Sequence, residues 1–186
     1  MLFPLLVTLL PVLFLAGLIL KAAAFRRRNV DMDGTPPIPK ALFVSSKYAI
    51  VIAWGAMVIQ SWGGKLSFID IPGLVTSASL GLWVLGFALL FAGRFGLGDS
   101  FRIGSPKEST GLKQTGLYRF SRNPMYVGVY ATLCAAVLGT LNPILFLVAV
   151  FVIAVHHKIV LAEEAQLRLA FGSEYRTYCS RVRRYL

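Results

Sequence analysis

Five apolar stretches, each long enough to cross a bilayer, constrain this chain more than any other feature. The first, residues 2–20, contains no charged residue, and four more follow at residues 41–62, 74–95, 125–141 and 144–160. A hydrocarbon core of about 30 Å takes roughly 20 residues of α-helix, and a backbone exposed to lipid must satisfy its own hydrogen bonds. We therefore expect an all-α fold, an integral membrane bundle of about five transmembrane helices.

The composition agrees with this class, because 56% of the 186 residues are hydrophobic and only 15% are charged. A chain of this length and composition has no room for a separate soluble domain such as a dinucleotide-binding Rossmann fold. The formal net charge is +11. In a membrane protein, Lys and Arg gather on cytoplasmic loops and beside anionic lipid. We therefore expect membrane lipid, and no nucleic acid, as the partner of these charges.

Basic and nearly neutral connections alternate along the chain. Basic residues concentrate at 21–40, 94–122 and 157–184, whereas the turns at 61–73 and 141–143 are nearly neutral. By the positive-inside rule, the N-terminus lies outside and the C-terminus inside. A cleaved signal peptide carries its positive charge before the apolar core, but here the charge follows the core, so we expect a retained first span.

The final stretch, residues 161–185, is too charged to span a membrane. Its apolar residues recur at helical spacing among charged ones, which predicts an amphipathic helix on the cytoplasmic interface. Just before it, the turn at Asn142-Pro143 makes two apolar helices antiparallel neighbours.

Two polar clusters lie at the cytoplasmic ends of these neighbouring helices, so we expect them to be close in space. One is the segment 121–126, Ser-Arg-Asn-Pro-Met-Tyr, and the other is Glu163-Glu164. Asn123 suits a helix N-cap and Pro124 suits the first helical position. The segment also fits a plain membrane anchor, and the spacing of Glu164 and Arg168 also fits an exposed ion pair. The pattern alone leaves both interpretations open.

The residues that could bind a metal or a nucleotide do not have the spacing of a known binding motif. The adjacent side chains of His156 and His157 point about 100° apart on a helix and lack HxxxH or HExxH spacing, so we expect no metal. Cys134 and Cys179 form neither a CxxC motif nor a disulfide framework. The glycine-rich run at 93–100 lacks the residues of a phosphate-binding loop.

The two polar clusters resemble the motifs of isoprenylcysteine carboxyl methyltransferases and the related phospholipid methyltransferases. In that family a first pattern, G-x-Y-x-x-x-R-H-P-x-Y-x-G, precedes a hairpin of two apolar helices, and E-E-x-x-L-x-x-x-F-G-x-E-Y-x-x-Y follows it. The first pattern is matched by Gly116, Tyr118, Arg122, Pro124, Tyr126 and Gly128. The second is matched by Glu163, Glu164, Leu167, Phe171, Gly172, Glu174, Tyr175 and Tyr178.

This resemblance implies a membrane methyltransferase that uses S-adenosyl-L-methionine and acts on a lipophilic small molecule or a lipidated substrate. Residues 1–95 would then be N-terminal transmembrane helices, and residues 96–186 a catalytic region of loop, hairpin and last helix. The cofactor contacts carried over from the family are Thr110, Gly111, Leu112, Lys113, Tyr118, Asn123, Pro124, Met125, Tyr126 and Glu163. The catalytic candidates are Glu163, Glu164 and Arg122.

The chain departs from the family pattern at three positions. Asn123 and Thr110 replace histidines, and Ile159 replaces an arginine, with His157 and Lys158 as candidate substitutes. Asparagine still donates and accepts hydrogen bonds but does not titrate. The asparagine form resembles a bacterial branch, which implies a bacterial inner membrane.

Two other functions stay open at this point. A membrane reductase of the steroid 5α-reductase type, which uses NADPH, has a similar terminal hairpin, but the segment 126–129 lacks the acid expected there. The other is a non-catalytic membrane protein whose polar ends set topology.

Overall fold

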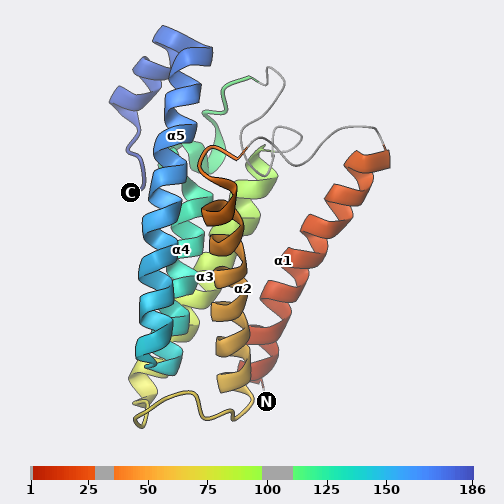
Figure 1. The fold of residues 1–186 in the computed structure, drawn as a ribbon, viewed down its shortest axis with the longest axis vertical. Helices are drawn as coiled ribbons and strands as arrows, with labels where there is room; N and C mark the ends of the chain where they lie inside the picture. The colour runs from red at the N-terminus through yellow and green to blue at the C-terminus, as the bar shows by residue number, and fades with distance from the viewer. Residues whose placement is uncertain (1, 28–35, 98–110) are drawn as a thin grey trace.

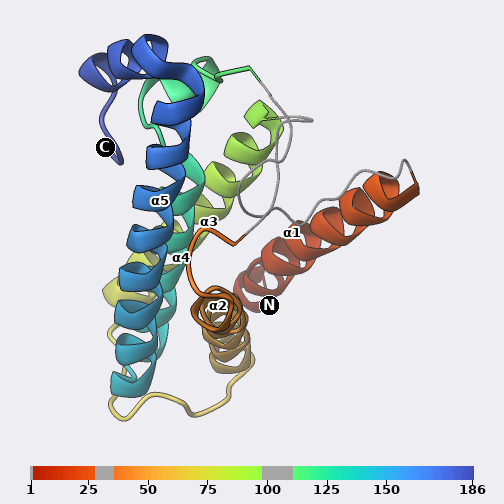
Figure 2. The ribbon, with the colours of Figure 1, turned by 45° about the horizontal axis from the view of Figure 1, so that its top comes forward.

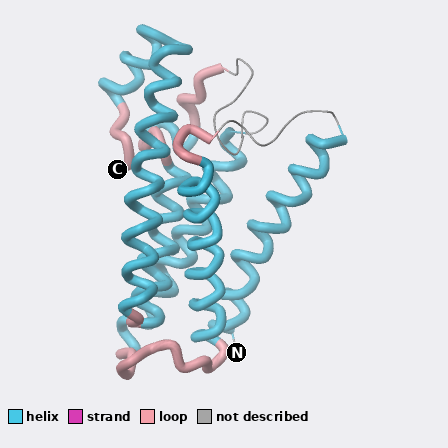
Figure 3. Tube along the Cα trace, in the orientation of Figure 1, coloured by secondary structure: helices cyan, strands magenta, loops and turns pink. Residues whose placement is uncertain are grey.

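The structure, a computed structural model, describes residues 2–27, 36–97 and 111–186, and these residues form helices joined by turns, with no strand among them (Figures 1 and 3). The all-α fold is confirmed. In chain order the elements are α1 (Leu2–Arg27), α2 (Lys40–Ser61), α3 (Gly73–Leu97), a 3-10 helix (Gly116–Arg119), α4 (Pro124–Thr140) and α5 (Pro143–Arg181).

Four of the described helices, α1, α2, α3 and α5, are long and apolar enough to cross a membrane, and α4 is a shorter apolar helix of 17 residues. These helices fit the expected membrane bundle. At 1.5 Å per residue α4 is about 25 Å long, whereas the part of α5 that precedes its kink at Gly172, residues 143–171, extends about 43 Å. Only the apolar part of α5, residues 144–160, therefore lies beside α4 in the bilayer, and the charged remainder projects beyond it.

The amphipathic helix expected at 161–185 is not a separate element, because α5 continues through residue 161 without a break. No proline or glycine interrupts the helix until Gly172, whose φ of 48° and ψ of −116° turn the chain. Glycine adopts such a positive φ readily, since it has no Cβ. Figure 2 shows the last part of α5 turned across the end of the bundle.

Small residues bring α3 and α4 into close contact in the core. A Cβ on Gly128 would lie 2.7 Å from the carbonyl oxygen of Gly86, and a Cβ on Gly86 would lie 2.9 Å from the oxygen of Gly128. Membrane helices use such glycines for close backbone approach. Trp54 of α2 adds a hydrogen bond of 3.0 Å to the Thr132 hydroxyl on α4. In contrast, α1 diverges from the other helices, and the distance grows toward its C-terminal end (Figures 1 and 2).

The hairpin between α4 and α5 fixes how the two helices lie against each other. Leu141 takes a left-handed conformation, and the Asn142 side chain accepts hydrogen bonds from the amides of Ile144 and Leu145 at 2.9 and 3.3 Å. The N-terminal end of α4 at Pro124 consequently lies beside the part of α5 that carries Glu163. We call this end of the bundle the site end and the opposite one the hairpin end.

Candidate active site

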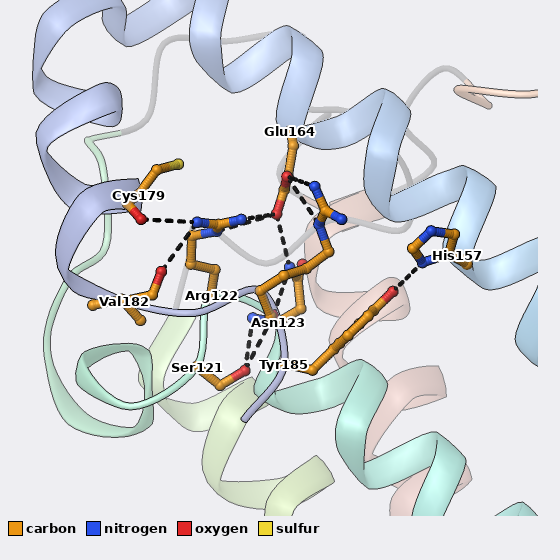
Figure 4. Close-up of polar contacts among 9 residues, drawn as sticks. Ser121, Arg122, Asn123, His157, Glu164, Cys179, Val182 and Tyr185 are labelled. Atoms are coloured by element: carbon orange, nitrogen blue, oxygen red, sulfur yellow. Dashed lines mark hydrogen bonds and ion pairs between the residues drawn. The ribbon is translucent and has the colours of Figure 1, made fainter.

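Glu164 is the centre of a buried ion-pair network at the site end (Figure 4). Its side chain is 3% exposed. Arg122 donates to Oε1 from Nε at 3.1 Å and from Nη2 at 2.9 Å, and Arg184 donates to Oε2 from Nε at 3.2 Å and from Nη2 at 3.0 Å. Burial by itself raises the pKa of Glu164, but these arginines outweigh it and lower the pKa. Glu164 therefore stays ionised and holds three segments together.

Arg122 is as fully engaged as Glu164. Its Nη1 donates to the carbonyl oxygens of Cys179 and Val182 at 3.3 and 3.0 Å, and its backbone amide donates to the oxygen of Arg183 at 3.0 Å. The loop before α4 is thus tied to the residues that follow α5. Neither a solvated anchor nor an exposed pair between Glu164 and Arg168 describes this arrangement, because Glu164 is buried and pairs with Arg122 and Arg184.

Asn123 precedes Pro124, the first residue of α4, as the sequence predicts, but its side chain makes no capping hydrogen bond. The amide Nδ2 instead donates to Glu164 Oε1 at 3.4 Å and to the carbonyl oxygen of Arg184 at 3.2 Å. The expectation of an asparagine cap was wrong in this respect. The Asn123 side chain binds the ion-pair network instead of its own helix. A local sequence pattern cannot reveal such a contact, because Glu164 and Arg184 are distant in the chain.

Glu163 points to a different neighbour from Glu164. Its Oε2 accepts a hydrogen bond of 3.1 Å from the Tyr126 hydroxyl, and its Oε1 has no hydrogen-bond partner among the residues that the structure describes. Burial raises the pKa of Glu163 to about 7, against smaller opposite effects of the Tyr126 hydrogen bond and the Lys47 charge. The Tyr126 ring also meets His156 edge-on, with ring centroids 5.5 Å apart.

Tyr118 is buried in the 3-10 helix that leads to this end of the bundle. Its hydroxyl donates to the carbonyl oxygen of Gly93 at 3.4 Å, and its own carbonyl oxygen accepts from the Tyr178 hydroxyl at 2.6 Å. Tyr178 belongs to the second motif and forms a buried cluster with Tyr175 and Val182. Leu112 packs against this cluster. These contacts join the stretch before the first motif to the turned end of α5.

The other predicted contact residues are spread over several environments. Gly111 and Lys113 are exposed, and Thr110 lies outside the described residues. Pro124 is buried at the start of α4, while Met125 packs toward Phe25 and Gly93. The structure thus brings Tyr126 and Glu163 into direct contact but turns Met125 to the neighbouring helices.

Sequence reasoning did not find Arg184 and Tyr185, which follow α5. Arg184 completes the pairing of Glu164, and the Tyr185 hydroxyl lies 2.8 Å from Nδ1 of His157 and 3.5 Å from the Tyr130 hydroxyl. The only signal was the basic run at 181–184, which reads as an interfacial charge cluster. A turn in the helix at Gly172 was needed to bring these residues back over α4.

A hollow of about 540 Å³ opens at the hairpin end, away from all of these residues. It is formed by the N-terminal ends of α1 and α3, the C-terminal ends of α2 and α4, and the loop between α2 and α3. It is lined by Phe3, Met57, Gln60, Ser61, Lys65, Ser67, Phe68, Ile69, Asp70, Ile71, Thr76 and Gly139. None of the predicted site residues contributes to it.

Comparison with known proteins settles the family. No curated protein matches the chain. The family profile described as phospholipid methyltransferase matches residues 73–174, from the start of α3 to the turned part of α5, which is more than half of the chain. The matched range contains Arg122, Tyr126 and the Glu163-Glu164 pair. The chain therefore belongs to the phospholipid methyltransferase family, a family of membrane methyltransferases.

Proposed function

We propose that this protein transfers a methyl group from S-adenosyl-L-methionine to a hydrophobic or lipidated acceptor at the cytoplasmic face of a bacterial inner membrane. One observation carries the proposal. In the Tyr126–Glu163 pair, a carboxylate whose second oxygen has no hydrogen-bond partner among the described residues lies beside an aromatic ring, at the site end of two membrane helices. Family membership supports methyl transfer, and the pair supports a cationic methyl donor.

The residues at this pair fit such a donor. When bound, S-adenosyl-L-methionine supplies a methyl group on a positively charged sulfur. An aromatic face attracts a cation by about 0.5 to 2 kcal/mol, and a half-enclosed carboxylate adds charge attraction. Tyr126 and Glu163 would provide these two contacts. Tyr118, Asn123 and the stretch 111–113, which lie along the same end of the bundle, would hold the rest of the cofactor.

Arg122 and Glu164 have a different part in this proposal. Their donors and acceptors are used by each other, by Arg184 and by backbone carbonyls. We infer that they position the loop before α4 rather than touch the reacting atoms. Methyl transfer is an in-line displacement, so a protein accelerates it mainly by orienting the donor and the acceptor and by excluding water. A rigid loop serves both needs.

Titration calorimetry with the protein in neutral detergent tests donor binding. We expect S-adenosyl-L-methionine to bind the wild type and to bind Glu163→Gln at least about tenfold more weakly, since a charge-assisted contact is lost. Asp70→Asn, which removes an exposed carboxylate at the hairpin end, is the matched control and keeps wild-type affinity. Absence of binding to the wild type, or equal binding by Glu163→Gln, would refute the proposal.

A second measurement tests whether the acceptor is a carboxylate. Membranes that contain the protein are incubated with donor carrying a radiolabelled methyl group, and the extracted lipids and lipidated molecules are counted before and after mild base. Base releases label from a methyl ester but not from a thioether or an N-methyl group. A carboxylate acceptor is thereby separated from a thiol or an amine acceptor, and unlabelled extracts would contradict a membrane acceptor.

A further inference from the structure

The hollow of about 540 Å³ at the hairpin end is separate from the predicted site residues. Gly139 of α4, which lines it, lies about 20 Å along the helix from Tyr126. Among the described lining residues, only Thr76 and Gly139 fall within the range matched by the family profile. Ligand-binding pockets usually measure about 300 to 1,000 Å³. The hollow is therefore large enough for a ligand of its own.

Hydrogen bonds hold the loop between α2 and α3, which forms one wall of the hollow, in a defined conformation. Near the end of α2, Gln60 Oε1 accepts from the amides of Leu66 and Ser67 at 2.9 and 3.2 Å. Asn142, in the turn between α4 and α5, donates from Nδ2 to the carbonyl oxygen of Leu66 at 2.7 Å. The loop is thus fixed to α2 and to the hairpin, as is usual for the wall of a preformed binding site.

Large apolar side chains on and beside this loop are exposed, namely Trp62, Phe68, Ile69 and Leu74. The Trp62 ring also donates a hydrogen bond of 2.9 Å to the Thr8 hydroxyl on α1. Exposed aromatic side chains at the ends of membrane helices are typical of the level of the lipid headgroups. The loop joins the ends of two helices that are long and apolar enough to cross a membrane. We therefore expect the hollow to open at the depth of the headgroups.

Two residues of opposite charge, Lys65 and Asp70, line the hollow. Both side chains are exposed, and neither forms an ion pair within the described part of the chain, either with the other or with a third residue. Phe3 and Ile71 add apolar surface to the same hollow. Binding sites match the charges of their ligands, so this lining fits a molecule that carries one positive and one negative group.

We propose that the hollow binds the zwitterionic headgroup of a membrane phospholipid, with the phosphate at Lys65 and the ammonium group at Asp70. The Lys65 ammonium donates to the phosphate oxygens, and the Asp70 carboxylate attracts the positive group of the lipid. The acyl chains remain in the bilayer beside the helices. This lipid is a bound ligand and not the methyl acceptor, because the hollow and the Tyr126–Glu163 pair lie at opposite ends of the bundle.

Thermal unfolding in neutral maltoside micelles tests this site with three amphiphiles that share one tail and are added at the same low mole fraction. Dodecylphosphocholine carries both charges, dodecyl phosphate only the negative one, and dodecyltrimethylammonium only the positive one. A ligand that binds the folded state raises the unfolding temperature. We expect dodecylphosphocholine to stabilise the wild type more than the other two. Glycerophosphocholine has the headgroup without the tail, and equal stabilisation by it would overturn a lipid site in favour of a soluble ligand.

Two variants test the two charges separately. Asp70→Asn keeps Lys65, so we expect it to bind dodecylphosphocholine about three- to fivefold more weakly and no longer to prefer it over dodecyl phosphate. Lys65→Gln keeps Asp70 and should instead lose the preference over dodecyltrimethylammonium. A general loss of stability cannot produce these different changes in selectivity. Lys40→Gln and Glu174→Gln remove an exposed lysine and an exposed carboxylate at the site end, and these matched controls should keep the wild-type preference.

The outcomes distinguish this inference from the proposed function. S-adenosyl-L-methionine should bind both variants as it binds the wild type, because the hollow is far from the site end. If dodecylphosphocholine stabilises the wild type no more than the singly charged amphiphiles, or if both variants keep the wild-type preference, the lipid site is refuted and the methyl donor site stands. If the selectivity changes as expected but the donor does not bind the wild type, the lipid site stands and the proposed function fails.

Discussion

Replacing Glu164 by glutamine tests how the site end is held together. Glu164 is 3% exposed and accepts from both Arg122 and Arg184, whose side chains are 10% and 32% exposed. Breaking a buried pair by removing one partner costs about 3 to 5 kcal/mol, whereas a partly exposed pair contributes up to about 1 kcal/mol. Glutamine keeps the shape and one acceptor oxygen, so we expect the lower end, about 3 kcal/mol. For a chain of this size that corresponds to an unfolding temperature about 6 to 12 °C lower.

The assay is thermal unfolding in detergent, followed by the fluorescence of the buried tryptophans Trp54 and Trp83. Arg184→Gln should lose about 1 kcal/mol, because one third of its side chain is exposed. Glu174→Gln, an exposed carboxylate with a single hydrogen bond from Gln114, is the control and should change stability by less than about 0.5 kcal/mol. Equal unfolding temperatures for Glu164→Gln and Glu174→Gln would refute the structural role.

The pH dependence of the difference in stability between the wild type and Glu164→Gln provides an independent check. The folded-state pKa of Glu164 lies below its ordinary value of 4.5, so the stabilisation is present above pH 4.5 and is lost as pH falls through the folded pKa. The difference in unfolding temperature between the wild type and Glu164→Gln should therefore become smaller in acid. A gap that stays constant down to the acid limit of the folded protein would contradict the ionised pair.

Three further predictions concern other parts of the molecule. Gly128→Ala should destabilise the bundle by about 1 to 3 kcal/mol, because its Cβ would lie 2.7 Å from the Gly86 oxygen, and Gly81→Ala, with nothing within 4 Å, should not; thermal unfolding decides between them. Because the pKa of Glu163 is about 7, donor affinity should rise by up to about tenfold from pH 6 to pH 8 in calorimetry, and Glu163→Gln should abolish that rise if the carboxylate binds the cation. Tyr178→Phe should leave a buried carbonyl oxygen without its 2.6 Å donor and cost about 1 to 3 kcal/mol; unchanged unfolding would show that this bond contributes nothing.

The helical framework follows from the sequence because the signals that set it are local. Apolar runs, the Asn142-Pro143 turn and Pro124 place α2, α3 and α4 within one or two residues of the expected bounds. These features depend on side chains that act on their own backbone. The first helix extends further than expected, to Arg27, because the small and basic residues after Leu20 are good helix formers.

The site was predictable only in part, because its decisive contacts join residues far apart in the chain. The motif resemblance indicated that Tyr126 and Glu163 belong together, and they share a hydrogen bond. Nothing local showed that Glu164 would select Arg122 and Arg184 rather than Arg168. That choice depends on the turn at Gly172, whose positive φ a sequence pattern does not reveal.

The length of α4 has a consequence for the surrounding lipid. Its 17 residues reach about 25 Å, whereas a typical hydrocarbon core measures about 30 Å. A short hydrophobic segment is accommodated when the adjacent leaflet thins, at a cost of fractions of a kcal/mol per Å. We therefore expect lipids beside the start of α4 to lie with their headgroups drawn inward, closer to Tyr126, so that the thickness of the host membrane changes the lipid surroundings of the site end.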